Sequence, residues 1–125
     1  MHKILVIDDN EDFRHTLIDL LELEGYEVIG AADGIEGVNL YRQNPVELVI
    51  TDLIMPNKEG IETIQELCRD YPDVKIIAIS GGGRSCSDPG LFLCAAKDLG
   101  SMKSFQKPLD IKTFLNAVRK ILHDD

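Results

Sequence analysis

Short apolar runs alternate with amphipathic stretches along the whole chain, and this alternation constrains the fold more than any other feature of the sequence. Five runs, most of them rich in β-branched residues, predict strands over 4–7, 28–31, 48–51, 76–79 and, more weakly, 102–106. Continuous apolarity over so few residues is typical of a strand buried on both faces, as in a parallel sheet covered by helices.

An amphipathic stretch of helical period follows each of these runs. The expected inward faces are Phe13, Leu17, Leu20 and Leu21; Ile35, Val38 and Tyr41; Ile61, Ile64, Leu67 and Cys68; Leu91, Ala95, Ala96 and Leu99; and Ile111, Phe114, Leu115, Val118, Ile121 and Leu122. Asp33 with Glu36 resembles a capping box, and Asp110 is an expected N-cap. Gly25 and Gly100 supply C-terminal stops.

Five strand–helix units in strict alternation predict an α/β fold, a doubly wound parallel sheet of five strands with helices on both faces. The connections between strands should be right-handed. A chain of 125 residues is long enough for one domain and too short for two, so we expect a single domain over 1–125 with no output domain.

Charge and composition exclude several classes of partner. The net charge of −9 argues against nucleic acid and against anionic membranes, since both are bound by clustered Lys and Arg. The apolar run that ends at Asp8 is too short for a signal peptide or a membrane span, which favours a cytoplasmic location. The three histidines, His2, His15 and His123, are expected to be solvated and isolated from one another.

Polar residues follow four of the five predicted strands, at the point where each strand ends. Asp8 and Asp9 follow the first, Asp52 the third, Ser80 the fourth and Lys107 the fifth. In an open doubly wound sheet, ligands bind beyond the carboxyl ends of the strands. These five side chains are therefore the candidate site.

Three carboxylates in one pocket need something to relieve their repulsion. Two unit charges about 4 Å apart repel by roughly 4 kcal/mol at an effective dielectric constant near 20. Protonation, pairing with Lys107 or binding of a hard divalent cation, Mg²⁺ above all, would relieve it. The simpler alternative is that Asp8 and Asp9 only cap the following helix. Asp52 is either a metal ligand alone or also a nucleophile that forms an acyl phosphate.

Four segments together resemble the receiver domains of bacterial two-component response regulators, over essentially the whole chain. They are ILVIDD over 4–9, TDLIMPNKEG over 51–60, Ser80, and Lys107 with Pro108. The resemblance implies a flavodoxin-like (βα)5 fold with strand order 2-1-3-4-5. It makes Asp52 the phosphoacceptor, with Ser80 and Lys107 acting on the phosphoryl group.

The same resemblance implies a set of Mg²⁺ ligands. Asp9 and Asp52 would bind the ion directly, Asp8 mostly through a water molecule, and Ile54 through its backbone carbonyl. The Lys107–Pro108 bond is typically cis in this family.

Two features depart from the family pattern. Ser104 stands three residues before Lys107, where the family usually has Tyr or Phe as a rotameric switch, and Phe105 follows it in the expected inward position. Some family members that pass phosphoryl groups onward also lack this aromatic residue. The glycine-rich segment 81–90 is longer than usual, which fits a reshaped docking surface, a gate over the phosphoryl group or a tolerated insertion.

The implied function is a phosphoacceptor switch, a signalling module rather than an enzyme. It would receive a phosphoryl group from a sensor histidine kinase or a histidine phosphotransfer domain. It would then dock to an unknown downstream protein or pass the group on, as a monomer or a phosphorylation-dependent dimer.

Two alternatives of other classes fit the sequence less well. An aspartyl-phosphate hydrolase of haloacid dehalogenase type needs an acid two residues after the nucleophile, where this chain has Ile54. A flavin carrier of the same fold needs a Ser/Thr/Gly phosphate loop after the first strand, where Asp8 and Asp9 would repel phosphate.

Overall fold

The computed structural model describes residues 2–52, 60–81, 103–107 and 109–123. Its five strands form one parallel sheet in the order β2-β1-β3-β4-β5. Their bounds are β1 Lys3–Ile7, β2 Glu27–Ala31, β3 Leu48–Asp52, β4 Ile76–Gly81 and β5 Lys103–Lys107. The predicted sheet and its strand order are thereby confirmed, with strand ends shifted by at most two residues.

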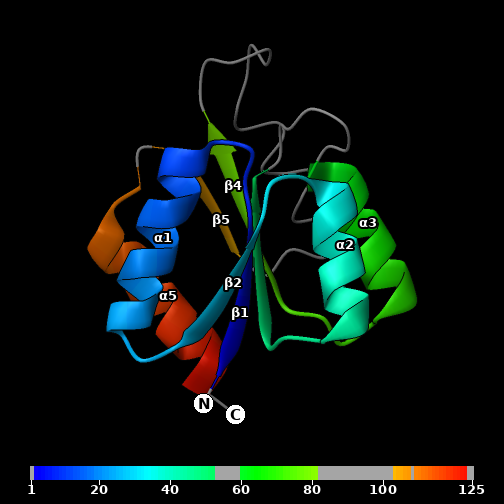
Figure 1. Ribbon diagram of the computed structural model, residues 1–125. Helices are drawn as coiled ribbons and strands as arrows, with labels where there is room; N and C mark the ends of the chain where they lie inside the picture. Colours follow the sequence, from blue (N-terminus) through cyan, green and yellow to red (C-terminus); the bar gives the residue numbers. More distant parts are fainter. Residues whose placement is uncertain (1, 53–59, 82–102, 108, 124–125) are drawn as a thin grey trace.

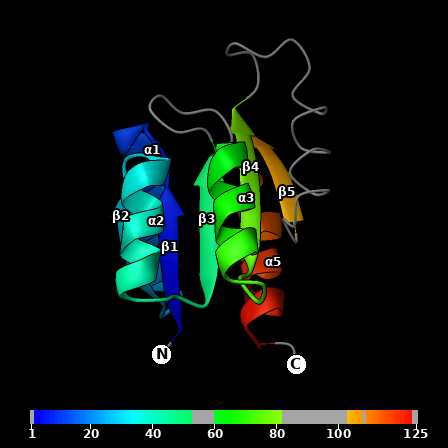
Figure 2. The same cartoon turned by 90° about the vertical axis from the view of Figure 1, so that its right-hand side faces the viewer.

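Helices cover both faces of this sheet (Figures 1 and 2). One face carries α1 Glu11–Leu23 and α5 Ile111–His123, and the other carries α2 Gly34–Gln43 and α3 Gly60–Asp70. The predicted helix over 91–99, and all but the first residue of the 81–90 segment, lie outside the described residues. Among the helices described, none is long and apolar enough to cross a membrane.

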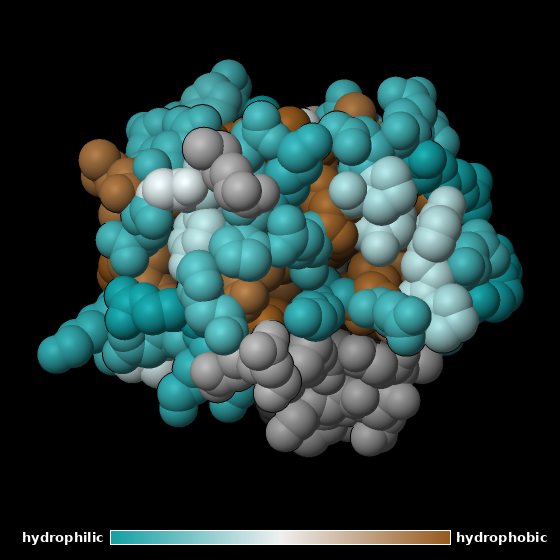
Figure 3. Space-filling view, turned by 90° about the horizontal axis from the view of Figure 1, so that it is seen from below, coloured by the Kyte–Doolittle hydropathy of each residue, from teal (hydrophilic) through white to brown (hydrophobic). Residues whose placement is uncertain are grey.

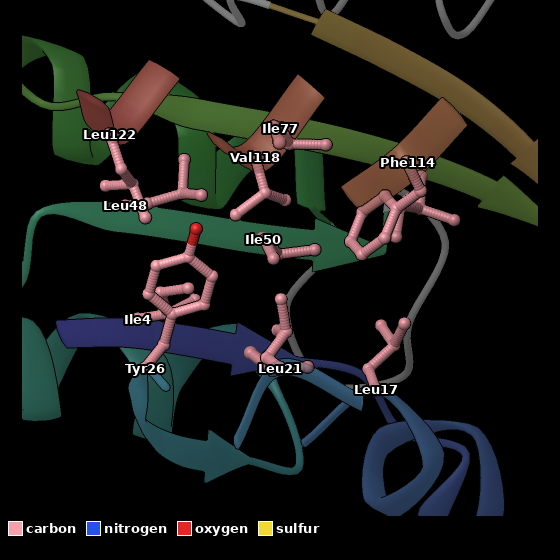
Figure 4. Close-up of a cluster of buried hydrophobic side chains, with 12 residues drawn as sticks. Ile4, Leu17, Leu21, Tyr26, Leu48, Ile50, Ile77, Phe114, Val118 and Leu122 are labelled. Atoms are coloured by element: carbon pink, nitrogen blue, oxygen red, sulfur yellow. The ribbon is translucent and has the colours of Figure 1, made fainter. Parts of the chain in front are cut away.

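The central strands are buried on both faces because their side chains alternate between two cores. Ile4 and Val6 of β1 point toward α1 and α5, whereas Leu5 and Ile7 point toward α2 and α3. Figure 4 shows the first core, in which α1 and α5 meet strands β1, β3 and β4. Its fully buried side chains include Ile4, Leu17, Leu21, Leu48, Ile50, Ile77, Phe114 and Val118.

Local signals in the sequence set the ends of the helices. The side chain of Asn10 caps α1 by accepting a hydrogen bond from the N–H of Phe13 at 3.0 Å. The expected cap of α2 is present: the N–H of Glu36 donates to Asp33 Oδ1 at 2.9 Å, although the Glu36 carboxylate accepts in return from Ala32. Gly25, with φ of 95°, follows α1 in the left-handed conformation that glycine adopts without strain.

Two residues expected to point inward are exposed. Ile35 has 52% of its surface exposed, because the buried stripe of α2 consists of Gly34, Gly37, Val38 and Tyr41. Ile111 is 38% exposed. It is the first residue of α5, so it has helical neighbours on one side only. For both residues the predicted burial is wrong.

The prediction of isolated histidines is also wrong for two of the three. The rings of His2 and His123 lie 4.6 Å apart between centroids, and the Tyr26 hydroxyl lies 3.3 Å from Nε2 of His123. His2 also contacts the carboxylate of Glu47. These residues meet because β1 begins and α5 ends at the same end of the molecule, whose surface is mainly hydrophilic (Figure 3).

Candidate active site at the carboxyl ends of the strands

Asp8 lies directly beyond β1 and is held in place by backbone hydrogen bonds. Its N–H donates to the carbonyl of Ala31 at 3.1 Å, which extends the β1–β2 pairing by one residue. Its Oδ1 accepts from the N–H of Asn10 at 2.9 Å. The side chain is buried, so the polypeptide fixes this carboxylate at the edge of the sheet before any ligand binds.

Asp52 is the last residue of β3, the strand beside β1. Ile7 pairs with Thr51 in the β1–β3 register, so the residues that follow, Asp8 and Asp52, emerge next to each other. Asp52 has none of its surface exposed. One carboxylate oxygen from each of Asp8, Asp9 and Asp52 lies within 4.8 Å of the other two. The expected convergence of the three acids is therefore found in the structure.

Lys107 ends β5 and brings the positive charge to this cluster. Its Nζ lies 3.2 Å from Asp8 Oδ2 and 3.6 Å from Asp52 Oδ2. Only 20% of the Lys107 side chain is exposed, so these ion pairs are partly shielded from water. The long lysine side chain spans the width of β4, the strand between β3 and β5.

Burial decides the protonation behaviour of Asp8. The loss of solvation raises the pKa of this carboxyl above its usual 3.8, even though the Asn10 N–H and the Lys107 ammonium both act to lower it. The charged form of Asp8 is thus incompletely compensated by the protein, and a bound cation would stabilise it.

The donor set fits a hard divalent cation. All three converging side chains offer carboxylate oxygens, which are the ligands that Mg²⁺ prefers. A soft metal would favour thiolate or imidazole ligands, and this cluster contains neither. Ile54, the fourth expected ligand, and Pro108 lie outside the described residues. For Ser80, the structure gives the backbone: it pairs with Gln106 near the end of β4.

Two residues of α1 contribute to the site that sequence reasoning did not assign to it. Arg14 donates from Nη1 to the carbonyl oxygen of Asp8 at 2.7 Å. The Nζ of Lys107 lies 4.1 Å from the centroid of the Phe13 ring. Their position in the sequence could have indicated this role, because both residues lie near the start of a helix that begins two residues after Asp9.

Comparison with known proteins gives a consistent result. The family model of the response regulator receiver domain matches residues 4–119. The chain is 34% identical to the chemotaxis protein CheY of Thermotoga maritima over 94% of this chain and 98% of that protein. It is 28% identical to sporulation initiation phosphotransferase F of Bacillus subtilis, over 96% and 93% of the two chains.

A solved structure agrees in fold over nearly the full chain. The response regulator protein TrrA from Thermotoga maritima, in complex with Mg²⁺ and BeF, superposes with a TM-score of 0.81 at 29% identity. The match covers 97% of this chain and 99% of that one. The extent of these matches, together with the sheet order, establishes that the chain belongs to the response regulator receiver domain family.

Proposed function

We propose that this chain is a phosphoacceptor switch in which Asp52 accepts a phosphoryl group. The donor is the phosphohistidine of a sensor kinase or of a histidine phosphotransfer domain. The observation that carries the proposal is the meeting of three carboxylates and one lysine at the carboxyl ends of β1, β3 and β5. Family membership supports a signalling module rather than the phosphatase alternative.

Mg²⁺ is the proposed cofactor, bound by Asp8, Asp9 and Asp52 together with the backbone carbonyl of Ile54. When bound, it would neutralise negative charge on the carboxylates and on the incoming phosphoryl group. TrrA, the relative described above, was solved with Mg²⁺ and BeF, which supports the same pair of ligands here.

In the transfer, Asp52 acts as the nucleophile and Lys107 stabilises the phosphoryl group. A carboxylate oxygen of Asp52 attacks phosphorus, the bond from phosphorus to the donor histidine nitrogen breaks, and that nitrogen retains the electron pair. Lys107, 3.6 Å from Asp52, exchanges its contact with the carboxylate for a contact with an equatorial phosphoryl oxygen. Ser80 is proposed to donate a hydrogen bond to the same group.

The proposed output is a contact with another protein or a second phosphoryl transfer. The phosphorylated domain docks to a downstream protein or transfers its phosphoryl group to a further histidine, and it works in the cytoplasm. Onward transfer is favoured by Ser104, which occupies the position of the usual aromatic switch.

Phosphoramidate, a small phosphodonor, tests the proposal without a kinase. With Mg²⁺, the wild-type protein should gain the mass of one phosphoryl group, and hydroxylamine should remove it as expected for an acyl phosphate. The Asp52→Asn variant and wild-type protein in EDTA should show no gain. A phosphoryl group that persists in Asp52→Asn would place the acceptor elsewhere and contradict the proposal.

A further inference from the structure

The ammonium of Lys107 is contacted from three directions, and one of them is an aromatic ring. Besides Asp8 and Asp52, its Nζ faces the Phe13 ring at 4.1 Å from the centroid. This is the distance at which an ammonium is attracted by the negative face of the ring.

Phe13 is itself well fixed. It is the third residue of α1, and its N–H donates to the Asn10 side chain that caps the helix. Its side chain is half-buried and packs against the core between α1, α5 and the sheet. The ring therefore offers the Lys107 ammonium a fixed contact in addition to its two ion pairs.

The chemistry of the pocket explains why an aromatic ring suits this task. The pocket already holds three carboxylates, and a phosphoryl group would add further negative charge. A fourth acid could hold Lys107, but it would also repel the phosphoryl group. A ring attracts the ammonium through its quadrupole and carries no formal charge, so it holds the lysine without this penalty.

We propose that Phe13 is a positioning residue that holds the Lys107 ammonium beside Asp52, ready to bind the incoming phosphoryl group. This inference rests on the proposed function, because it assumes that Lys107 acts on a phosphoryl group at Asp52. It adds a side chain from α1 to a site whose carboxylates and lysine lie at strand ends.

The test compares phosphorylation by phosphoramidate at saturating Mg²⁺ for wild-type, Phe13→Leu and Phe13→Tyr proteins. Leucine keeps an apolar side chain but removes the ring face, so the second-order rate constant of phosphorylation should fall by roughly two- to thirtyfold, the range of one cation–π contact. Tyrosine keeps the face and should restore most of the rate. Ile18→Ala, which removes packing from the same core without a described contact to Lys107, should change the rate little.

A double-mutant cycle separates positioning from packing. In a Lys107→Ala background, Phe13→Leu should cause no further loss of rate, because the lysine through which it acts is gone. An equal loss in both backgrounds, or an equal loss in Ile18→Ala, would overturn the inference.

An NMR measurement on the wild-type protein needs no variant. The Cε protons of Lys107 should show an upfield ring-current shift from Phe13, and unshifted protons would overturn the inference. A different result would refute the proposed function: the wild-type protein itself would then accept no phosphoryl group at Asp52. A wild-type protein that is phosphorylated, with a Phe13→Leu variant that reacts equally fast, would refute only the role of Phe13.

Discussion

Asp8 illustrates how a single side chain can be unfavourable for stability and suited to ligand binding. The residue is 1% exposed, and the effect of burial on the pKa of its carboxyl outweighs the attraction of Lys107 and the hydrogen bond from Asn10. The energetic cost of holding this charge is relieved when a cation binds. Such a conflict between folding and function is expected at a functional site.

The raised pKa of Asp8 predicts a pH dependence of stability in metal-free buffer. Between its unfolded value near 3.8 and its higher folded value, the native state binds more protons than the unfolded state. The free energy of unfolding contributed by Asp8 therefore falls as the pH rises through this window, and stays low at neutral pH.

Asp8→Asn should consequently stabilise the metal-free protein at neutral pH and flatten this dependence, as measured by urea unfolding in EDTA. Asp19→Asn removes the same charge from an exposed position of α1 and serves as the matched control. A variant Asp8→Asn that is less stable than wild type at neutral pH would show that the ion pair with Lys107 outweighs burial.

Among the secondary-structure elements, α2 shows what the sequence could and could not predict. The periodic pattern and the Asp33–Glu36 cap located the helix, but they placed Ile35 inward. The buried stripe includes Gly34 and Gly37, and glycine carries no hydrophobic signal in a sequence pattern. At Gly37 the helix packs very closely on Ile7 of β1. The strong helical period of their apolar residues also located α1, α3 and α5. Ile111 was predicted to be buried but is exposed, because it lies at the start of α5.

This close packing predicts that Gly37→Ala is destabilising. A Cβ at position 37 would contact the Cδ1 of Ile7 and come within 2.8 Å of its Cγ1, and Ile7 is fully packed in the core. The loss should be about 1–3 kcal/mol in the free energy of unfolding. Combining it with Ile7→Val, which removes the Cδ1 methyl, should cost less than the sum of the two single changes. Strictly additive losses would contradict the packing described.

For the molecule as a whole, the topology of the sheet determines which site residues could be predicted from the sequence. Sequence reasoning placed Asp8, Asp9, Asp52 and Lys107 at one edge because all carboxyl ends of a parallel sheet meet there. It did not assign Phe13 or Arg14 to the site, since their contacts depend on how α1 packs against β1 and β2 and on how far the Lys107 side chain reaches from β5. It also did not anticipate that His2 and His123 meet, because the closeness of the two ends of the chain follows from the assembled fold.

Mg²⁺ should raise the melting temperature of the whole domain. It would bind the folded carboxylate cluster and not the unfolded chain, so it should stabilise the fold by about 2.7 kcal/mol at a concentration 100 times its Kd. The comparison is thermal unfolding in EDTA and in Mg²⁺, for wild-type and Asp52→Asn proteins. The variant should lose much of the response, and an equal response in both proteins would indicate that Mg²⁺ binds elsewhere.

A crystal structure of the protein with Mg²⁺ and beryllofluoride would test most directly whether one site holds both the metal and the phosphoryl group. The account predicts beryllofluoride on the Asp52 carboxylate, Mg²⁺ bound by the acidic cluster, and the Lys107 ammonium on a fluoride while still facing Phe13. Beryllofluoride bound away from Asp52, or Mg²⁺ bound apart from Asp8, Asp9 and Asp52, would contradict it.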